Sequence, residues 1–275
     1  MSKVWFITGT SRGFGREWAE AALERGDSVA ATARDATSLK PLVDAYGEKV
    51  LPLTLDVTDK SAVDAVVARA HAHFGRLDVV VNNAGYGLFG TIEEVSEEQA
   101  RAQIETNLFG ALWVTKAVVP IMREQGSGHI IQVSSIGGIT AFANVGLYHA
   151  SKWGLEGFSQ ALSLEVEPFG VHVTVVEPTG YSTDWAGSSA VHADPIPVYD
   201  EARAARAART QPGMIGDPKA TREAILDIVD AEQPPLRVLF GKGLLARVQE
   251  EYGKRLATWE QWNDLSERAH GTPGA

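Results

Sequence analysis

The hydrophobic positions of the first 178 residues alternate between short apolar runs and longer amphipathic segments. Short runs rich in Val, Ile and Leu are typical of buried strands, and apolar spacings of three and four are typical of helices. The runs predict strands at 4–8, 28–33, 50–55, 77–81, 129–133 and 171–176. The amphipathic segments predict helices at 14–24, 37–46, 61–74, 97–123 and 148–166. Strands that alternate with helices predict right-handed crossovers and a parallel sheet.

The pattern loosens after residue 178 and tightens again in a predicted helix at 221–229 and a seventh strand at 236–240. Residues 181–216 are rich in small residues and Pro, and we expect an insertion over the active site. Loops beyond the carboxyl ends of parallel strands are where such sheets bind ligands. From residue 241, Leu, Val, Tyr and Trp at helical spacing predict one packed helix to about residue 265, followed by a disordered end.

No internal repeat or linker divides the 275 residues, so we expect a single domain. The fold class is α/β, with a Rossmann-type doubly wound parallel sheet of about seven strands and helices on both faces.

Charge and composition exclude several classes of protein. A formal net charge of −10 argues against a non-specific nucleic-acid binder, because such binding depends on clustered Lys and Arg. No apolar run approaches the roughly 18 residues that span a bilayer, so no membrane partner is expected. The chain has no Cys, which removes disulfides and thiolate metal ligands, and no metal is predicted. The first strand starts too close to Met1 for a cleaved leader, so we expect a cytoplasmic protein.

A glycine-rich turn follows the first predicted strand. Gly9, Gly13 and Gly15 have the spacing Gly-x3-Gly-x-Gly and lie where the first helix begins. Glycines there let the backbone turn sharply and approach a pyrophosphate, whose charge is favoured by the N–H groups of the helix N-terminus. Such a turn can also be only a tight connection. After the first strand of a doubly wound sheet, we interpret it as a dinucleotide site.

The end of the second strand indicates which nicotinamide cofactor fits. An acidic side chain there would bind the ribose 2′-hydroxyl of NAD, whereas an Arg would neutralise the 2′-phosphate of NADP. We place the last strand residue at Ala33, followed by Arg34, with Arg12 of the glycine loop nearby. Two guanidinium groups suit a phosphate dianion, so we predict NADP(H) as the preferred cofactor. Asp35 leaves NAD(H) possible, and both arginines could be ordinary surface residues.

Tyr148 and Lys152 lie four residues apart on a predicted helix, so both point to one face. A phenol has a pKa of about 10, and a nearby ammonium lowers that pKa. A Tyr tuned in this way can protonate a ketone or deprotonate an alcohol while a nicotinamide exchanges hydride with the carbon. Ser134 and Ser135 close the fifth strand at the same crevice, where a hydroxyl could donate to the developing oxyanion. Either serine could instead cap a turn.

Together these residues resemble the short-chain dehydrogenase/reductase superfamily over about Lys3 to Phe240. The matching pieces are Thr8-Gly9-x-x-x-Gly13-x-Gly15, Asp56-Val57, Asn82-Asn83-Ala84-Gly85, Asn107, Ser135, Tyr148-x-x-x-Lys152 and Pro178-x-Gly180 with Thr183. In the family pattern the catalytic Ser lies 13 positions before the Tyr, which selects Ser135 over Ser134.

The resemblance implies a role for each matching residue. Tyr148 would be the acid/base, and Lys152 would lower its pKa and hold the nicotinamide ribose. Ser135 would orient the substrate carbonyl, and Asn107 would anchor a water that relays protons to Lys152. The residues implied to bind the cofactor are Gly9, Ser11, Arg12, Gly13, Phe14, Gly15, Arg34, Asp56, Val57, Asn83, Ala84, Gly85, Tyr148, Lys152, Pro178, Thr179, Gly180 and Thr183. Asn83 and Asn107 could instead only satisfy neighbouring backbone groups.

The segment 6–16 and the tail with Trp259 resemble the 17β-hydroxysteroid-dehydrogenase-like branch, which includes many bacterial carbonyl reductases. The chain departs from the family at Thr179, where relatives usually have the middle Gly of Pro-Gly-Gly. A β-branched residue there is expected to crowd the nicotinamide ring or its carboxamide.

Large apolar side chains fall on loops that should meet above the nicotinamide. They are Tyr86, Leu88, Phe89, Ile136, Phe142, Val145, Leu147, Tyr181 and Trp185. A pocket of this kind, with Ser135 and Tyr148 as its polar focus, suits a bulky or aromatic ketone, although several of these residues could only pack the loops. We therefore predict an NADPH-dependent reductase that converts a hydrophobic ketone to a secondary alcohol.

Three alternatives stay open at this point. The first is NAD-dependent oxidation of an alcohol or hydroxysteroid, and the second is a non-catalytic dinucleotide-sensing protein. A methyltransferase is disfavoured, because its chemistry needs no Tyr–Lys pair. The helices after Asn107 and around Lys152 carry more apolar residues than one core face needs, among them Trp113, Val114, Phe158 and Leu162. Relatives form dimers and tetramers through these helices, so we expect a homodimer or homotetramer.

Overall fold

The computed structural model describes residues 2–207 and 215–271, and within them seven parallel strands form one sheet. The strands are β1 (Val4–Ile7), β2 (Ser28–Ala33), β3 (Val50–Thr54), β4 (Val79–Asn82), β6 (Gly128–Val133), β7 (Val171–Pro178) and β9 (Arg237–Phe240). Their order is β3-β2-β1-β4-β6-β7-β9, so the winding direction reverses between β1 and β4. The predicted doubly wound sheet is confirmed, and each strand begins and ends within two residues of its predicted range.

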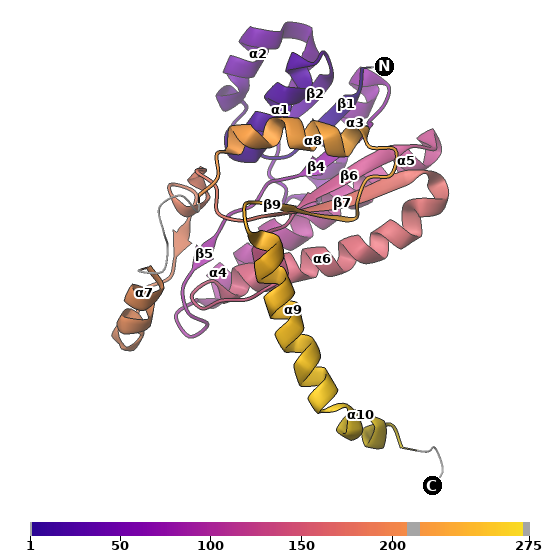
Figure 1. The fold of residues 1–275 in the computed structure, drawn as a ribbon. Coiled ribbons are helices and arrows are strands. Elements are labelled where there is room, and N and C mark those ends of the chain that lie inside the picture. The colour runs from indigo at the N-terminus through magenta and orange to yellow at the C-terminus, as the bar shows by residue number, and fades with distance from the viewer. Residues whose placement is uncertain (1, 208–214, 272–275) are drawn as a thin grey trace.

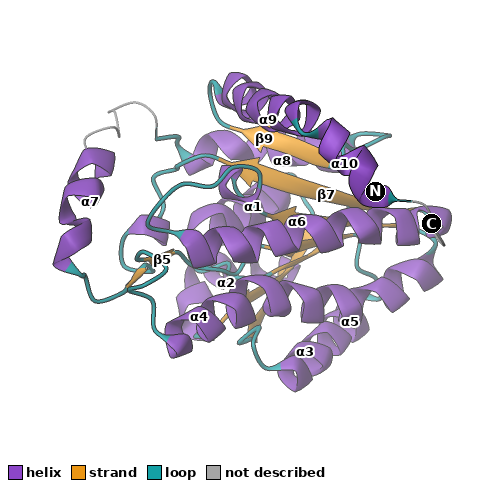
Figure 2. Cartoon of the chain, turned by 90° about the horizontal axis from the view of Figure 1, so that it is seen from below, coloured by secondary structure: helices purple, strands orange, loops and turns teal. Residues whose placement is uncertain are grey.

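Helices cover both faces of the sheet (Figure 1). The helices of the domain are α1 (Gly13–Glu24), α2 (Lys40–Tyr46), α3 (Lys60–Phe74), α4 (Glu97–Ile104), α5 (Gly110–Gln125), α6 (Gly146–Val166), α7 (Asp200–Ala207) and α8 (Thr221–Asp230). Figure 2 shows α3, α5 and α6 on one side, where α5 contacts both α3 and α6. On the other side α1 contacts α8.

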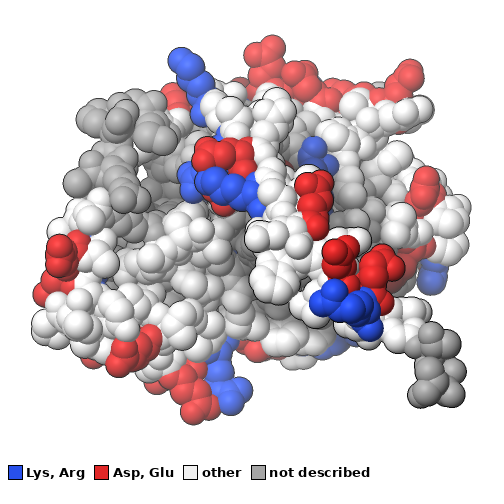
Figure 3. Space-filling view, turned by 60° about the horizontal axis from the view of Figure 1, so that its bottom comes forward, with Lys and Arg blue, Asp and Glu red and all other residues white. Residues whose placement is uncertain are grey.

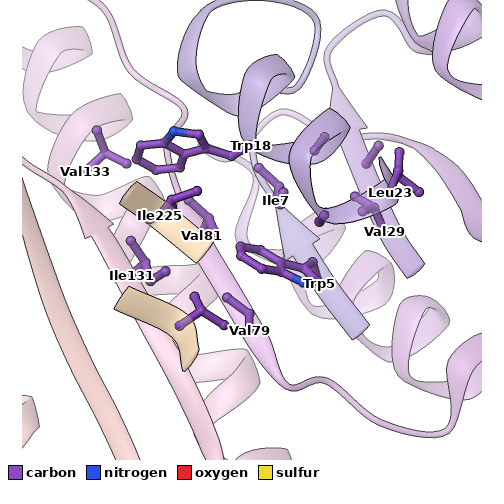
Figure 4. Packing of buried hydrophobic residues seen from close by; sticks show 14 of the residues in the cluster. Trp5, Ile7, Trp18, Leu23, Val29, Val79, Val81, Ile131, Val133 and Ile225 are labelled. Carbon is purple, nitrogen blue, oxygen red and sulfur yellow. The ribbon is translucent and has the colours of Figure 1, made fainter. Parts of the chain in front are cut away.

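Alternation along β1 explains why both faces are apolar. Trp5 and Ile7 point to the cluster that packs α1 and α8, whereas Val4 and Phe6 point to the cluster that packs α3, α5 and α6. Successive side chains of a strand face opposite sides, so a central parallel strand reads as one continuous apolar run. Figure 4 shows Trp5 and Trp18 within the first of these clusters.

Three regions differ from the sequence prediction. The predicted helix 97–123 runs as α4 and α5 joined by a π-helical segment, Glu105–Phe109. Val114 and Leu162, predicted as surface residues for assembly, belong to the core cluster under α5 and α6. The predicted single packed tail helix is wrong, because the tail forms α9 (Leu244–Gln261) and α10 (Asn263–His270), in which only Leu244 is buried. The predicted disorder at 272–275 lies outside the described residues.

The insertion between β7 and α8 holds α7 and the short strand β8 (Val191–His192). β8 pairs with β5 (Leu88–Phe89), so the insertion is joined to the loop after β4. Residues 208–214 of the predicted insertion lie outside the described part of the chain. Within the described residues, no helix combines the length and apolar character needed to cross a bilayer.

Candidate active site

The glycine-rich loop after β1 is closely packed and ends at a helix whose N-terminus lacks a side-chain cap. Gly9 and Gly13 have backbone φ angles of +71° and +59°, which residues other than glycine rarely adopt. A Cβ on Gly15 would lie 2.4 Å from the Gly9 carbonyl oxygen. The N-cap of α1, Arg12, makes no side-chain hydrogen bond to the helix. The first N–H groups of α1 are therefore available to an anion, as a pyrophosphate site requires.

Two side chains that follow the central strands hold this loop. The Thr8 hydroxyl accepts hydrogen bonds from the backbone N–H groups of Asn83 (2.9 Å) and Ala84 (3.0 Å). The Asn83 amide donates to the carbonyl oxygens of Thr8 (2.8 Å) and Gly9 (3.1 Å). The Asn83 side chain thus satisfies neighbouring backbone groups, one of the two roles considered from the sequence. Thr8 was not among the predicted site residues, although a polar residue at the end of a buried apolar strand could have indicated its role.

The residues predicted to choose the cofactor lie at the end of β2. Ala33 is its last residue, as predicted, and Arg34 is exposed. The Asp35 carboxylate accepts hydrogen bonds from the Thr37 backbone N–H (2.9 Å) and hydroxyl (2.7 Å), which lower the pKa of Asp35. Asp35 therefore caps the turn that follows β2.

Arg12 contacts the insertion. Its Nη1 lies 3.4 Å from the Asp184 carboxylate and 3.0 Å from the Ser188 hydroxyl. Both ends of the ion pair are about half exposed, so the pair is weak and can exchange for another anion.

Two other predicted cofactor residues, Asp56 and Val57, follow β3. The Asp56 carboxylate accepts hydrogen bonds from the Thr58 backbone N–H (3.0 Å) and hydroxyl (2.7 Å) and is exposed. Val57 is buried, and a Cβ on Gly110 of α5 would lie 2.6 Å from its Cγ2. Val57 therefore also fixes the start of α5 against the sheet.

Ser135, Tyr148 and Lys152 meet at the carboxyl end of β6. The Ser135 hydroxyl is hydrogen-bonded to the Tyr148 phenol and also accepts from the Gly137 backbone N–H (3.0 Å). The Lys152 ammonium lies 5.8 Å from the centre of the Tyr148 ring and donates to the Val133 carbonyl oxygen (2.7 Å). Both side chains lie on one face of α6, as predicted. The structure thus pairs Ser135 with the phenol and leaves Ser134 buried beside Gly138.

Burial dominates the electrostatics of this group. Tyr148 and Lys152 are each 6% exposed. Burial raises the pKa of Tyr148 to about 12, and the Ser135 hydrogen bond opposes this shift. Burial lowers the pKa of Lys152 to about 8. The net direction for Tyr148 is opposite to the sequence prediction, because the depth of the phenol in the fold is not visible in the spacing of two residues. At neutral pH Tyr148 carries its proton and can act as an acid.

Asn107 lies in the π-helical segment between α4 and α5 and is buried. Its amide oxygen accepts from the Tyr86 backbone N–H (3.1 Å), and its amide nitrogen donates to the Tyr86 carbonyl oxygen (2.9 Å) and the Ser151 hydroxyl (3.3 Å). Single π-helical turns inside helices are often found at functional sites. The Asn107 side chain therefore ties the loop after β4 to α6, next to the Tyr148 turn.

The segment after β7 places its side chains differently from expectation. The Thr179 methyl packs against Gly241, where a Cβ would lie only 2.5 Å from Thr179 Cγ2. Gly241 has a φ of +143°, so both space and backbone conformation favour glycine at this position. Thr183 accepts a hydrogen bond from the Trp185 backbone N–H (3.4 Å) and starts the turn that carries Trp185. The Thr179 methyl group, which was expected to crowd the nicotinamide, therefore points toward Gly241 at the start of the tail.

An aromatic group adjoins the Tyr148 ring. The Trp185 ring lies 4.9 Å from the Tyr148 ring and 5.2 Å from the Phe89 ring, measured between centres. Gly87 faces the Trp185 edge, because a Cβ there would lie 2.7 Å from it. Burial raises the pKa of Tyr86, the half-buried residue at the start of this loop. Trp185 and Phe89 are thus the predicted pocket residues that the structure brings to Tyr148.

Other predicted pocket residues have different neighbours. Ile136 is buried against Ile139 and Leu244 at the root of the tail. Tyr181 packs on Phe14 of α1, with ring centres 4.9 Å apart. Phe142 lies under the Arg247 guanidinium of α9, at 5.5 Å. The sequence predicted the loops that carry these residues, but the direction in which each side chain packs depends on contacts with α1 and the tail.

His149 is a site residue that sequence reasoning missed. Its Nδ1 lies 2.8 Å from the Gly137 carbonyl oxygen, and its Nε2 accepts a hydrogen bond from the Phe142 backbone N–H (3.1 Å). A carbonyl can only accept, so the neutral ring carries its proton on Nδ1. His149 therefore fixes the turn after Ser135 to the loop before α6. Its place directly after Tyr148 was the only signal in the sequence.

Comparison with known proteins extends these observations. The family model for short chain dehydrogenase matches residues 3–193. "Oxidoreductase BOA17" of Botryotinia fuckeliana is 42% identical over 97% of this chain and 98% of its own. The 3-ketodihydrosphingosine reductase of Bacteroides thetaiotaomicron is 41% identical over 66% of this chain and 65% of its own.

Two solved structures are similar in fold and sequence. A short-chain dehydrogenase from Streptomyces avermitilis has a TM-score of 0.91 and 38% identity, over 98% of this chain and all of that chain. An alcohol dehydrogenase from Thermococcus sibiricus, complexed with 5-hydroxy-NADP, has a TM-score of 0.75 and 25% identity, over 88% of this chain and 97% of that chain.

Proposed function

Because this chain belongs to the short-chain dehydrogenase family and is an NAD(P)-dependent oxidoreductase, we propose that it reduces a hydrophobic ketone to a secondary alcohol with NADPH. The observation that carries this proposal is the buried Tyr148 phenol, hydrogen-bonded to Ser135 and carried on the same helical face as Lys152. A phenol that keeps its proton at neutral pH is suited to protonate an alkoxide, which is the step that ketone reduction requires.

Each residue of the site is assigned a role that its position supports. A bound nicotinamide supplies the hydride. The Ser135 hydroxyl donates a hydrogen bond to the substrate carbonyl oxygen and so stabilises the charge that develops there. Tyr148 gives its phenolic proton to the same oxygen as the alcohol forms. Because Ser135 already contacts the phenol, one substrate oxygen can be reached by both hydroxyls.

Lys152 and Asn107 support the proton donor. The ammonium of Lys152 lies close enough to the Tyr148 ring to favour the phenolate left after proton transfer. Asn107 fixes the Tyr86 backbone and, through Ser151, the turn that carries Tyr148. We assign to Asn107 the positioning of a water that relays a proton from solvent to Lys152, after the ammonium has passed a proton back to the Tyr148 phenolate.

The residues present fit a dinucleotide. The uncapped N-terminus of α1 and the tightly packed Gly9 and Gly15 leave backbone N–H groups for a pyrophosphate. Preference for NADP(H) is supported by Arg34 and Arg12, since both guanidinium groups are exposed. It is also supported by Asp35, whose carboxylate is already engaged by Thr37.

Thermal melting with NADPH and with NADH in parallel tests the cofactor preference. A ligand that binds the folded state raises the melting temperature according to its affinity. We expect the larger rise with NADPH at equal concentration. A larger rise with NADH would refute the preference and favour NAD-dependent alcohol oxidation.

The substrate class rests on the aromatic group beside Tyr148. Trp185 and Phe89 offer apolar surface next to the phenol, and apolar pockets with few polar groups bind hydrophobic ligands. The 3-ketodihydrosphingosine reductase among the relatives bears the name of a ketone reductase, which agrees with this class.

A screen of aryl, aliphatic and steroidal ketones, read as oxidation of NADPH, tests the activity. We expect turnover of at least one class and a loss of about 10²–10⁴-fold in kcat for Tyr148→Phe, the usual range for a lost general acid. Tyr46→Phe, on α2, is the matched control and should keep wild-type turnover. Undiminished turnover by Tyr148→Phe would contradict the mechanism, and NADPH binding without any turnover would favour a dinucleotide sensor.

Assembly through α5 and α6 is the remaining part of the proposal. Phe109 and Trp153 are exposed near these helices, and the Phe109 ring stacks on Trp113 at 5.8 Å. Apolar side chains of this kind on adjoining helices suit a symmetric contact between copies. We expect a homodimer or homotetramer in solution.

A further inference from the structure

The tail helices α9 and α10 form an arm that leaves the sheet layers and extends away from the domain (Figure 1). One side of α9 contacts the domain. Leu244 is buried with Ile136, and Val248 packs against the same small cluster. The Arg255 guanidinium lies 5.0 Å from the Trp153 ring of α6. Residues 244, 248 and 255 are spaced by four and seven, so they define the face of α9 that holds the arm to the domain.

A second face of α9 is apolar and largely exposed, although the Arg255 guanidinium lies 5.4 Å from the ring of one of its members, Tyr252. Its members and their exposed fractions are Leu245 (61%), Tyr252 (46%), Leu256 (51%) and Trp259 (63%). With about 100° of rotation per residue, they fall within one narrow sector of the helix, which we call the arm stripe. Arg247, Glu250 and Lys254 lie on the opposite side by the same geometry. Trp262, between α9 and α10, and Leu265 of α10 are also about half exposed.

The arm stripe is large enough to form an interface. An aromatic side chain buries roughly 150–250 Å². About half exposure of the four large side chains of the stripe therefore leaves roughly 400 Å² of apolar surface, to which Trp262 and Leu265 add, against about 800 Å² per partner in a standard interface. Isolated apolar residues are normal on a surface, but a continuous patch of this size indicates a binding face.

We propose that the arm stripe is covered by the arm of a second copy of this chain, packed antiparallel about a two-fold axis near Tyr252. Two members of the stripe, Leu245 and Trp259, each lie seven positions from that residue, one on either side of it along the chain. A two-fold axis at Tyr252 places Leu245 of one copy opposite Trp259 of the other, as an isologous contact requires.

Charge disfavours a membrane or nucleic acid as the occupant. The arm carries five acidic and four basic side chains between residues 244 and 270, and the whole chain has a net charge of −10. Helices that lie on anionic membranes and segments that bind nucleic acid are enriched in Lys and Arg. Figure 3 shows a face of the molecule on which wide uncharged areas separate clusters of both signs. An uncharged stripe on an arm of balanced charge suits a copy of itself.

Cysteine cross-linking tests the geometry directly, because the chain contains no Cys. In the full chain, Tyr252→Cys lies next to the proposed axis, where two copies of one residue approach each other. A disulfide needs Cα atoms about 4.4–6.8 Å apart, which a close helix pair at its axis can provide. We expect Tyr252→Cys to give a disulfide-linked dimer on mild oxidation, whereas the control Lys254→Cys, on the opposite side of α9, stays uncross-linked. Equal cross-linking of both variants, or of neither, overturns the proposal.

Sedimentation velocity provides a second, independent measurement. Leu256→Arg combined with Trp259→Arg places charges in the stripe, and we expect it to halve the mass of the wild-type assembly. Thr258→Arg combined with Gln261→Arg adds the same charge on the opposite side of α9 and should leave that mass unchanged. All four residues are exposed, so melting temperatures should stay close to wild type. A wild-type monomer of 29.5 kDa, an unchanged mass in the stripe variant, or a monomer that floats with phosphatidylcholine vesicles overturns the proposal.

Discussion

Lys152 is expected to destabilise the fold that it serves. Its ammonium is buried and donates one hydrogen bond, to the Val133 carbonyl oxygen at 2.7 Å. Burial lowers its pKa from 10.5 to about 8, so at neutral pH the folded protein holds a charge that the unfolded chain holds more favourably. Replacement by Met keeps an unbranched side chain of similar length and removes that charge.

The magnitude follows from the shift. A difference of about 2.5 pKa units corresponds to about 3 kcal/mol at 1.36 kcal/mol per unit. Loss of the hydrogen bond to Val133 offsets about 1–3 kcal/mol of this gain. At pH 7 we therefore expect Lys152→Met to be about as stable as wild type or up to about 2 kcal/mol more stable. For a chain of this size that corresponds to a rise of up to roughly 4–8 °C in melting temperature.

The pH dependence separates the two contributions. Between pH 8 and 10.5 the unfolded chain binds more protons at Lys152 than the folded protein, so the wild-type free energy of unfolding rises with pH. Lys152→Met has no titratable group at this position and therefore lacks this rise in stability with pH. The stability of the variant relative to wild type should therefore fall by about 3 kcal/mol across this window, whatever the Val133 hydrogen bond contributes.

Urea denaturation of both proteins from pH 7 to 10 measures this difference, because the other titrating groups are shared. Lys116→Met, which alters an exposed lysine of α5, is the matched control and should show little dependence on pH in its difference from wild type. The same Lys152→Met protein should be inactive toward ketones. A difference between Lys152→Met and wild type that stays constant from pH 7 to 10 would refute the claim that burial of the charge sets the pKa.

Three further outcomes are expected. Gly15→Ala should lose about 1–3 kcal/mol of stability and most NADPH affinity, because its Cβ would overlap the Gly9 carbonyl oxygen. The control Gly157→Ala, on the exposed side of α6, should instead stabilise the fold by up to about 1 kcal/mol. Thermal melts of both variants with and without NADPH measure the two effects. Asp184→Asn should tighten NADPH binding by up to about fivefold and leave NADH binding unchanged, because it frees Arg12 from a half-exposed ion pair. An unchanged NADPH affinity in calorimetric titration would contradict the assignment of Arg12 to the 2′-phosphate site. The kcat/KM for ketone reduction should be level below pH 8 and fall about tenfold per unit above it as Lys152 loses its proton, so a level profile to pH 10 would contradict the role of the ammonium.

The sequence alone was sufficient to predict those features of the fold that depend on a single segment of the chain. The apolar runs predicted all seven strands because a central parallel strand must be apolar on both faces. The spacing of Tyr148 and Lys152 placed both on one face of α6 because a helix repeats every 3.6 residues. The glycine spacing predicted the turn after β1, and Gly9 and Gly13 do adopt the left-handed conformation.

Tertiary contacts decided what depends on distant parts of the chain. The pKa of Tyr148 rises because the surrounding fold buries the phenol, an effect that no local spacing contains. Trp185 reaches Tyr148 because β8 pairs with β5, whereas Ile136 packs under the tail. The sequence placed both residues on loops near the active site but did not determine which neighbours each side chain would contact. The tail was predicted as packed because its apolar spacing is helical. That spacing determines a helix but not its neighbour, since an apolar stripe is equally compatible with the domain and with a second chain.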